Sequence, residues 1–159
     1  MSWTDHPVNS KAALPFALKI SDSSDNELRI ILATAKTGDK KSLSTGSPKL
    51  DDILVNSELI EPDKQNVYEI VFSDYIIYQC WNESYTAFDD TEIRSGKYLV
   101  IFEKSKLLDY YQDVIFDYDT DDIISQKKHY GIITANHIID VLSSLEPTIR
   151  RIIIWEYSE

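Results

Sequence analysis

Apolar and polar residues alternate at several places along the chain, and this alternation predicts β-strands. It runs over 14–20 and again over 28–32, on either side of the turn-rich segment 21–26. A period of two is that of a half-buried strand, so we predict a hairpin here. Runs rich in β-branched and aromatic residues predict further strands, and Ser73 and Asp74 divide the first of these runs into two strands or bend it. The runs lie at 67–81, 97–102 and 148–155.

A second hairpin is predicted near the end of the sequence, where two apolar runs flank a turn that contains Asn136. Asparagine tolerates the left-handed conformation of tight turns, so Asn136 is able to adopt it here. If Thr134 pairs with His137 across this turn, the alternation places His129 and Asp140 on one face of the hairpin and His137 on the other.

A period of 3.6 residues predicts two helices. The clearer helix begins after Ser105, whose hydroxyl can cap it, and a shorter helix begins at Ser47 and Pro48. These elements predict an α+β fold, in which a largely antiparallel sheet packs with one main amphipathic helix and a short helix. The apolar face of the main helix consists of Leu107, Leu108, Tyr111, Val114, Ile115 and Tyr118.

The chain has 159 residues, 43% of them hydrophobic, which suffices for one domain with its own core. We expect a single domain over 1–159, with a long loop at about 37–49 where Gly, Ser and Pro gather. Cys80 is the only cysteine, so no internal disulfide can form, and its apolar neighbours predict a small buried side chain. The sequence shows neither a secretory signal nor an apolar run of ~20 residues, so we expect a cytoplasmic protein with no membrane contact.

The net charge of −11 belongs to the part of the chain after residue 50. Residues 1–50 hold seven basic and five acidic side chains, whereas residues 51–159 hold nine basic and 22 acidic ones. Nucleic-acid binding relies on Lys and Arg to neutralise phosphates, so we expect no direct contact with nucleic acid. The excess of carboxylates favours a basic protein as the partner.

The sequence shows no signature of cofactor binding or of nucleophilic catalysis. The four glycines form neither a dinucleotide-binding nor a phosphate-binding loop, and no serine stands in a G-x-S-x-G segment. We therefore expect no cofactor, no metal and no catalytic residue. The alternative is a metal-dependent or acid/base hydrolase that uses Glu83, His129, His137 and Asp140. The predicted hairpin turns the two histidines apart, which favours structural roles for them.

The main predicted helix carries a row of carboxylates on the side opposite its apolar face. Asp109, Asp113 and Asp117 recur every four residues, and the aromatic residues Tyr110 and Phe116 lie at the two edges of this row. Such a row can be a solvated face, but aromatic rings among carboxylates are typical of a protein interface. The candidate partner-binding residues are Asp109, Tyr110, Asp113, Phe116, Asp117, Asp119, Asp121 and Asp122.

These observations lead to the hypothesis of a non-enzymatic acidic protein that masks a basic partner. An immunity or inhibitor protein that neutralises a toxin or a nuclease works in this way, and a row of carboxylates can mimic nucleic-acid phosphates. A second alternative, besides the hydrolase, is a sensing or regulatory domain whose sheet binds a small ligand.

Three segments resemble an uncharacterised family of small bacterial domains. They read WNESY at 81–85, KSKLLDY at 104–110 and HYGIITANHIIDV at 129–141, within a stretch from about Tyr68 to Ile149. The resemblance implies a bacterial origin and a shared fold, and it brings no established activity.

Overall fold

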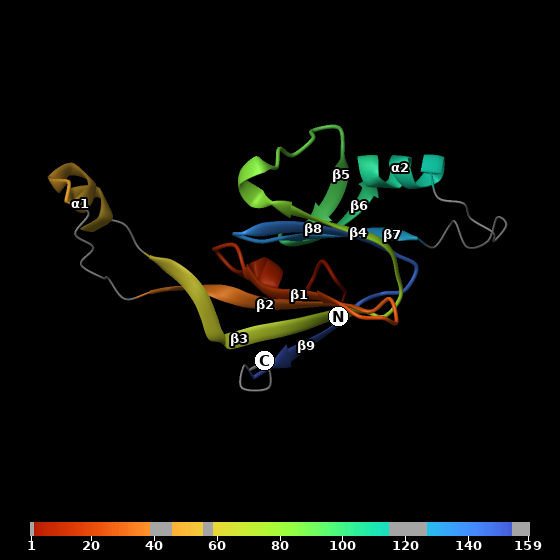
Figure 1. Ribbon diagram of the computed structural model, residues 1–159, viewed down its shortest axis with the longest axis horizontal. Coiled ribbons are helices and arrows are strands. Elements are labelled where there is room, and N and C mark those ends of the chain that lie inside the picture. Colours follow the sequence, from red (N-terminus) through yellow and green to blue (C-terminus); the bar gives the residue numbers. More distant parts are fainter. Residues whose placement is uncertain (1, 39–45, 56–58, 115–126, 154–159) are drawn as a thin grey trace.

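Two antiparallel β-sheets stack on each other, and two α-helices lie at the periphery (Figure 1). The computed structural model describes residues 2–38, 46–55, 59–114 and 127–153. The first sheet has the strand order β1 (Phe16–Asp22), β2 (Leu28–Thr37), β3 (Ile60–Phe72) and β9 (Thr148–Ile152). The second has the order β4 (Tyr75–Asn82), β8 (His137–Ser143), β7 (Lys128–Ile133), β6 (Leu99–Lys104) and β5 (Ile93–Gly96). The helices are α1 (Pro48–Val55), α2 (Lys106–Val114) and the short 3-10 helices η1 (Pro7–Ser10) and η2 (Glu83–Tyr85).

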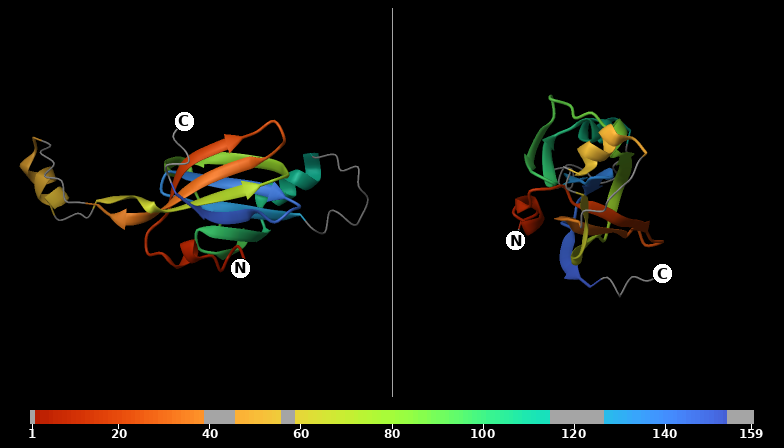
Figure 2. Two further views of the ribbon diagram at one scale, coloured as in Figure 1. Left: turned by 90° about the horizontal axis from the view of Figure 1, so that it is seen from below. Right: turned by 90° about the vertical axis from the view of Figure 1, so that its left-hand side faces the viewer.

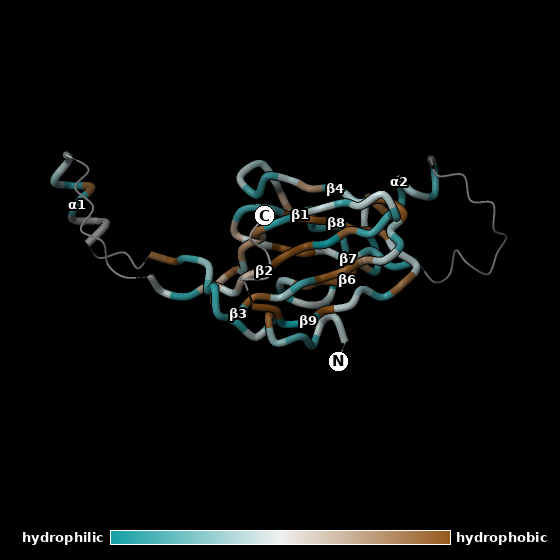
Figure 3. The backbone as a smooth tube through the Cα atoms, turned by 60° about the horizontal axis from the view of Figure 1, so that its bottom comes forward, coloured by the Kyte–Doolittle hydropathy of each residue, from teal (hydrophilic) through white to brown (hydrophobic). Residues whose placement is uncertain are grey.

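The two sheets lie one over the other (Figure 2), and an apolar core fills the space between them. Leu28, Ile30 and Ile70 enter it from the first sheet, and Ile132 and Ile139 enter it from the second, all without solvent exposure. Successive strand side chains point to opposite faces, so alternate residues of the central strands point into the core. The hydrophobic segments in Figure 3 accordingly follow the strands of both sheets. The fold is therefore dominated by antiparallel sheet, as predicted, but its strands form two sheets.

The predicted hairpin at 14–32 is confirmed as the antiparallel pair β1 and β2. The run at 67–81 consists of two strands, β3 and β4, separated by Ser73 and Asp74. These two strands belong to different sheets, so the chain passes from one sheet to the other at this turn.

The second predicted hairpin is confirmed as β7 and β8, in the expected register. The backbone N–H of Thr134 donates to the carbonyl of His137 at 2.9 Å. Asn136 does not use its ability to adopt the left-handed conformation, because Asn26 is the one non-glycine residue with positive φ in the described part of the chain. Instead, the Asn136 amide group accepts from the backbone N–H of Ala17 (3.0 Å) and donates to its carbonyl (2.8 Å). This side chain therefore joins the two sheets.

The segment before β1 packs against the second sheet near its β5–β6 hairpin. The Trp3 indole N–H donates to the carbonyl of Val100 at 2.9 Å, and its ring makes edge contacts with Phe72 and Tyr130. Asn9 Oδ1 accepts from two successive backbone N–H groups at 98–99, each at 2.8 Å. These contacts close one end of the core.

Helix α2 begins where the sequence predicts it. The Ser105 hydroxyl accepts from the backbone N–H three residues later at 3.2 Å, which caps the helix. Leu107 and Tyr111 are buried, as the predicted apolar face requires. The expected apolar residues Ile115 and Tyr118 lie outside the described residues.

Helix α1 begins at Pro48, as predicted, and stands away from the two sheets at the end of the extended β2–β3 hairpin (Figure 1). Residues 39–45 of the expected loop at 37–49 lie outside the described residues. None of the described helices is long and apolar enough to cross a membrane.

Candidate functional site

A pocket of about 240 Å³ lies on the outer face of the second sheet, which is the face turned away from the core. Val100, Ile133 and Ile138 line it and come from the neighbouring strands β6, β7 and β8. Gly131 opens the pocket between them, because a Cβ atom there would lie only 2.6 Å from Cγ2 of Val100. Helix α2 and the segment 83–92 flank the pocket. We refer to it as the outer pocket.

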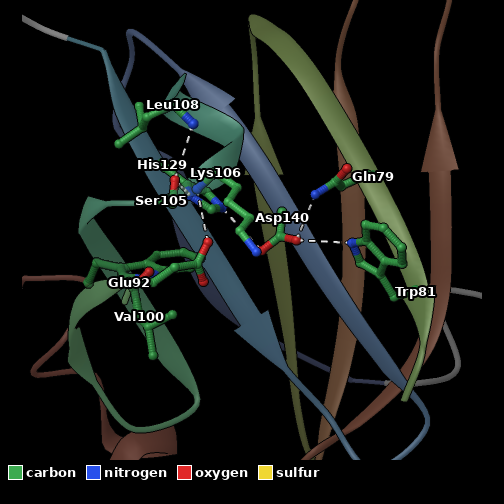
Figure 4. A network of polar contacts seen from close by, with 10 residues as sticks. Gln79, Trp81, Glu92, Val100, Ser105, Lys106, Leu108, His129 and Asp140 are labelled. Atoms are coloured by element: carbon green, nitrogen blue, oxygen red, sulfur yellow. Dashed lines mark hydrogen bonds and ion pairs between the residues drawn. The ribbon is translucent and has the colours of Figure 1, made fainter. Parts of the chain in front are cut away.

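Hydrogen bonds link α2 to β4 across this face of the sheet (Figure 4). The Ser105 hydroxyl lies 2.7 Å from Nδ1 of His129, and Nε2 of His129 lies 3.1 Å from Oδ1 of Asp140. Asp140 Oδ2 accepts from the side-chain amide of Gln79 at 3.0 Å and from the indole of Trp81 at 3.1 Å. Because a carboxylate only accepts, His129 donates from Nε2, and the Ser105 hydroxyl contacts the other ring nitrogen.

The strand alternation brings His129 and Asp140 together from neighbouring strands. Gly131 lies directly opposite Asp140 in the β7–β8 pair, and a Cβ atom there would lie 3.7 Å from Oδ1 of Asp140. The Phe102 ring stacks on the imidazole of His129, with centroids 4.1 Å apart and planes at 10°. Asp140 is only 9% exposed, and within the described residues neither Lys nor Arg pairs with it. Buried carboxylates usually have a cationic partner, so this one is unusual.

An ion pair ties the start of α2 to the flanking segment 83–92. The Lys106 ammonium contacts the Asp89 carboxylate, and its backbone N–H donates to Oε1 of Glu92 at 3.0 Å. The hydrogen bond from Lys106, with two further ones from Thr91, holds the pKa of Asp89 well below its usual range. The same contact raises the pKa of Lys106. The Lys106 side chain is exposed and that of Asp89 is half-buried, so the pair orients the rim more than it stabilises the fold.

The segment from 81 to 92 exposes three large aromatic rings beside the outer pocket. Tyr85 is 89% exposed, Phe88 is 53% exposed and Trp81 is 47% exposed. The segment holds four carboxylates and no Lys or Arg. Like the predicted acidic helix, this segment combines carboxylates with aromatic rings, and this combination can be recognised in the sequence. We name the acidic aromatic face by its residues on the two elements: Trp81, Glu83, Tyr85, Phe88, Asp90, Asp109, Tyr110 and Asp113.

The structure places three of the predicted partner-binding residues on α2. Asp109, Tyr110 and Asp113 are exposed. The other five predicted residues lie outside the described residues, so the full carboxylate row stays a prediction. These five are Phe116, Asp117, Asp119, Asp121 and Asp122.

Of the four residues considered for a hydrolase, the structure brings two together. His129 and Asp140 share a hydrogen bond at the outer pocket. His137 lies at the start of β8 and does not line that pocket, and its buried Nδ1 has no hydrogen-bond partner among the described residues. Glu83 begins η2, is exposed, and does not line the pocket either.

Cys80 differs from its prediction, because it is exposed on β4. β4 is an edge strand, so the apolar run around Cys80 is only partly covered. In the described ranges, no group of three or more His, Cys, Asp and Glu side chains is arranged to hold a metal ion.

Comparisons with known proteins add no relative to these observations. No protein-family model, no curated protein and no solved structure matches the chain.

Proposed function

We propose that this chain is a non-enzymatic acidic binding protein that takes a basic protein partner on its acidic aromatic face. The observation that carries the proposal is the exposure of Trp81, Tyr85 and Phe88 among carboxylates, next to a pocket. Large exposed apolar groups gathered in one place are typical of an interaction site. Trp and Tyr are also enriched among the few residues that dominate the binding energy at protein interfaces.

The charges of this face support a basic partner. Its four carboxylates, Glu83, Asp90, Asp109 and Asp113, make no ion pair with any other described residue. Unpaired carboxylates repel one another until a cation approaches, and they speed the encounter with a basic protein. A toxin or nuclease whose basic groove binds nucleic acid presents such a surface, so the proposed role is that of an immunity or inhibitor protein.

Charge reversal on α2 tests the proposal. The variant Asp109→Lys/Asp113→Lys is matched by the control Asp25→Lys/Asp74→Lys, which changes the net charge equally at two exposed turn residues. Proteins retained by the wild-type chain at low salt are identified by mass spectrometry, and their association rates are then measured with the purified proteins. We expect the α2 variant to associate with its basic partner at least about tenfold more slowly, and the control to associate nearly normally. Equal rates for both variants would contradict the proposal.

One observation favours the hydrolase alternative, namely the His129–Asp140 hydrogen bond at the outer pocket. In this alternative His129 moves a proton and Asp140 orients its ring. The Ser105 hydroxyl is an unsuitable nucleophile because it is buried and caps α2. Turnover of ester or phosphoester substrates that His129→Gln abolishes would favour this alternative over the binding protein.

A further inference from the structure

We infer that the outer pocket receives an arginine side chain of the basic partner. The inference rests on the proposed function for the source of this side chain, while the chemistry of the pocket is argued from its own residues. It adds a specific anchor to the general attraction between the acidic aromatic face and a basic protein.

The size of the pocket suits a single side chain. Its volume of about 240 Å³ lies below the roughly 300–1,000 Å³ of most small-molecule sites. Val100, Ile133 and Ile138 form an apolar floor, against which the aliphatic part of a long side chain can pack. A pocket of this kind at the centre of an interface typically takes one anchor residue.

The carboxylates that line the pocket favour the binding of a cation. Asp140 is nearly buried, accepts one N–H each from His129, Gln79 and Trp81, and makes no ion pair with a Lys or Arg of the described residues. A carboxylate offers about four acceptor positions, so one more donor can be accommodated. Glu92 lines the same pocket and uses one oxygen for the backbone N–H at the start of α2. An entering cation therefore meets two carboxylates.

The basic residues that line the pocket are already engaged. Lys106 pairs with Asp89, and the Arg94 guanidinium lies over the Phe88 ring with 4.3 Å to the centroid. This contact also shows that an aromatic ring of this rim accepts a guanidinium on its face. Trp81 presents a second, larger ring at the pocket, and planar guanidinium groups stack on indole better than ammonium groups do. The aromatic rim therefore favours arginine over lysine.

A capped amino acid tests the pocket without any partner. The probe is N-acetyl-L-arginine N′-methylamide, and the matched probe is the citrulline derivative, which has almost the same shape and no charge. The NMR signal of the Trp81 indole N–H reports on binding, because this group donates to Asp140. We expect a saturable shift of this signal with the arginine probe and none with the citrulline probe at the same concentrations.

Two isosteric variants localise the effect. Glu92→Gln keeps an oxygen that can accept from the start of α2 but removes a charge from the pocket, and Glu103→Gln removes a charge from an exposed residue that does not line it. We expect the arginine probe to bind Glu92→Gln about tenfold more weakly and Glu103→Gln as it binds the wild type. Equal weakening in both variants, or equal shifts with both probes, would overturn the inference.

The inference and the proposed function can fail separately. The probe experiment involves no partner, and the reversal of Asp109 and Asp113 changes no residue that lines the pocket. If charge reversal abolishes partner binding but the Trp81 signal does not respond to the probe, the proposed binding function is supported and the arginine pocket is refuted. If the Trp81 signal responds to the probe but charge reversal leaves partner binding unchanged, the guanidinium site is supported and the role of the acidic aromatic face in partner binding is refuted.

Discussion

Gly131 controls both the packing of β7 and the shape of the outer pocket, and its replacement by alanine gives a quantitative test. The new Cβ atom would lie 2.6 Å from Cγ2 of Val100 and 2.8 Å from Cε2 of Phe102. Carbon atoms pack best at about 3.5–4.0 Å, so these neighbours would have to move by nearly 1 Å. Val100 is completely buried, and the stacking of Phe102 on His129 limits its movement.

The cost follows from two opposing effects. Overpacking of a buried site costs about 1–3 kcal/mol. Replacing glycine in a strand returns about 0.5–1 kcal/mol, because alanine loses less backbone entropy on folding. We therefore expect Gly131→Ala to lower the free energy of unfolding by roughly 0–2.5 kcal/mol. For a chain of this size, each kcal/mol lowers Tm by about 2–4 °C.

Urea denaturation followed by tryptophan fluorescence measures the change, and an unchanged slope shows that the folded state stays compact. The variant Phe102→Leu removes Cε2, so the double variant should be less destabilised than the sum of the single variants by about 0.5–2 kcal/mol. Strict additivity, or a Gly131→Ala protein more stable than the wild type, would refute the close approach of these side chains.

Two further predictions concern contacts at the edge of the core and at the pocket rim. Asn136→Ala leaves the backbone N–H and carbonyl of Ala17 without their partner, so we expect a loss of about 1–3 kcal/mol in the free energy of unfolding; a loss below ~0.5 kcal/mol in urea denaturation would contradict this. Lys106→Met removes the main cause of the low pKa of Asp89, so this pKa should rise toward 3.8 in a carbon-detected NMR titration. In the wild type, the folded-state pKa of Asp89 lies below its unfolded value, so the contact stabilises the fold above pH 3.8 and loses this effect as the pH falls through the folded-state pKa. An unchanged titration in the variant would show that Lys106 does not hold this carboxylate.

Local patterns in the sequence predict the elements that depend on neighbouring residues. The hairpin of β7 and β8 and the placement of His129 beside Asp140 follow from strand alternation around a short turn. The start of α2 follows from the capping hydroxyl of Ser105. In each case the determining residues lie within about a dozen positions of one another.

Contacts between distant parts of the chain could not be predicted in this way. The turn at Ser73 and Asp74 reads equally well as a bend within one sheet, and only the pairing of β3 with β9 and of β4 with β8 assigns the strands to two sheets. The burial of Trp3 depends on a carbonyl 97 positions away. The sequence marks Asn136 as a turn residue, but its side chain links the two sheets through hydrogen bonds to Ala17, which lies 119 positions away.

The candidate site could be predicted only in part. The exposed carboxylates of α2 follow from helical periodicity, whereas the outer pocket needs the three-dimensional placement of β4, β8 and the segment 83–92. The acidic and aromatic composition of that segment was visible in the sequence, but its position beside α2 was not. Asp140 illustrates the limit, since the lack of an ion pair with a described Lys or Arg is a property of the folded sheet.

The edge position of β4 has a consequence for the synthesis of the chain. Among the described strands, β4 pairs only with β8, and β4 ends at Asn82 whereas β8 begins at His137. A ribosome that adds about 5–20 residues per second needs roughly 3–10 s to make the residues in between. During this time the apolar residues of β4 lack their partner strand, and unpaired strands promote aggregation. Substitutions that delay the pairing of β8 should therefore lower the yield of folded protein in the cell, even where the finished protein is as stable as before.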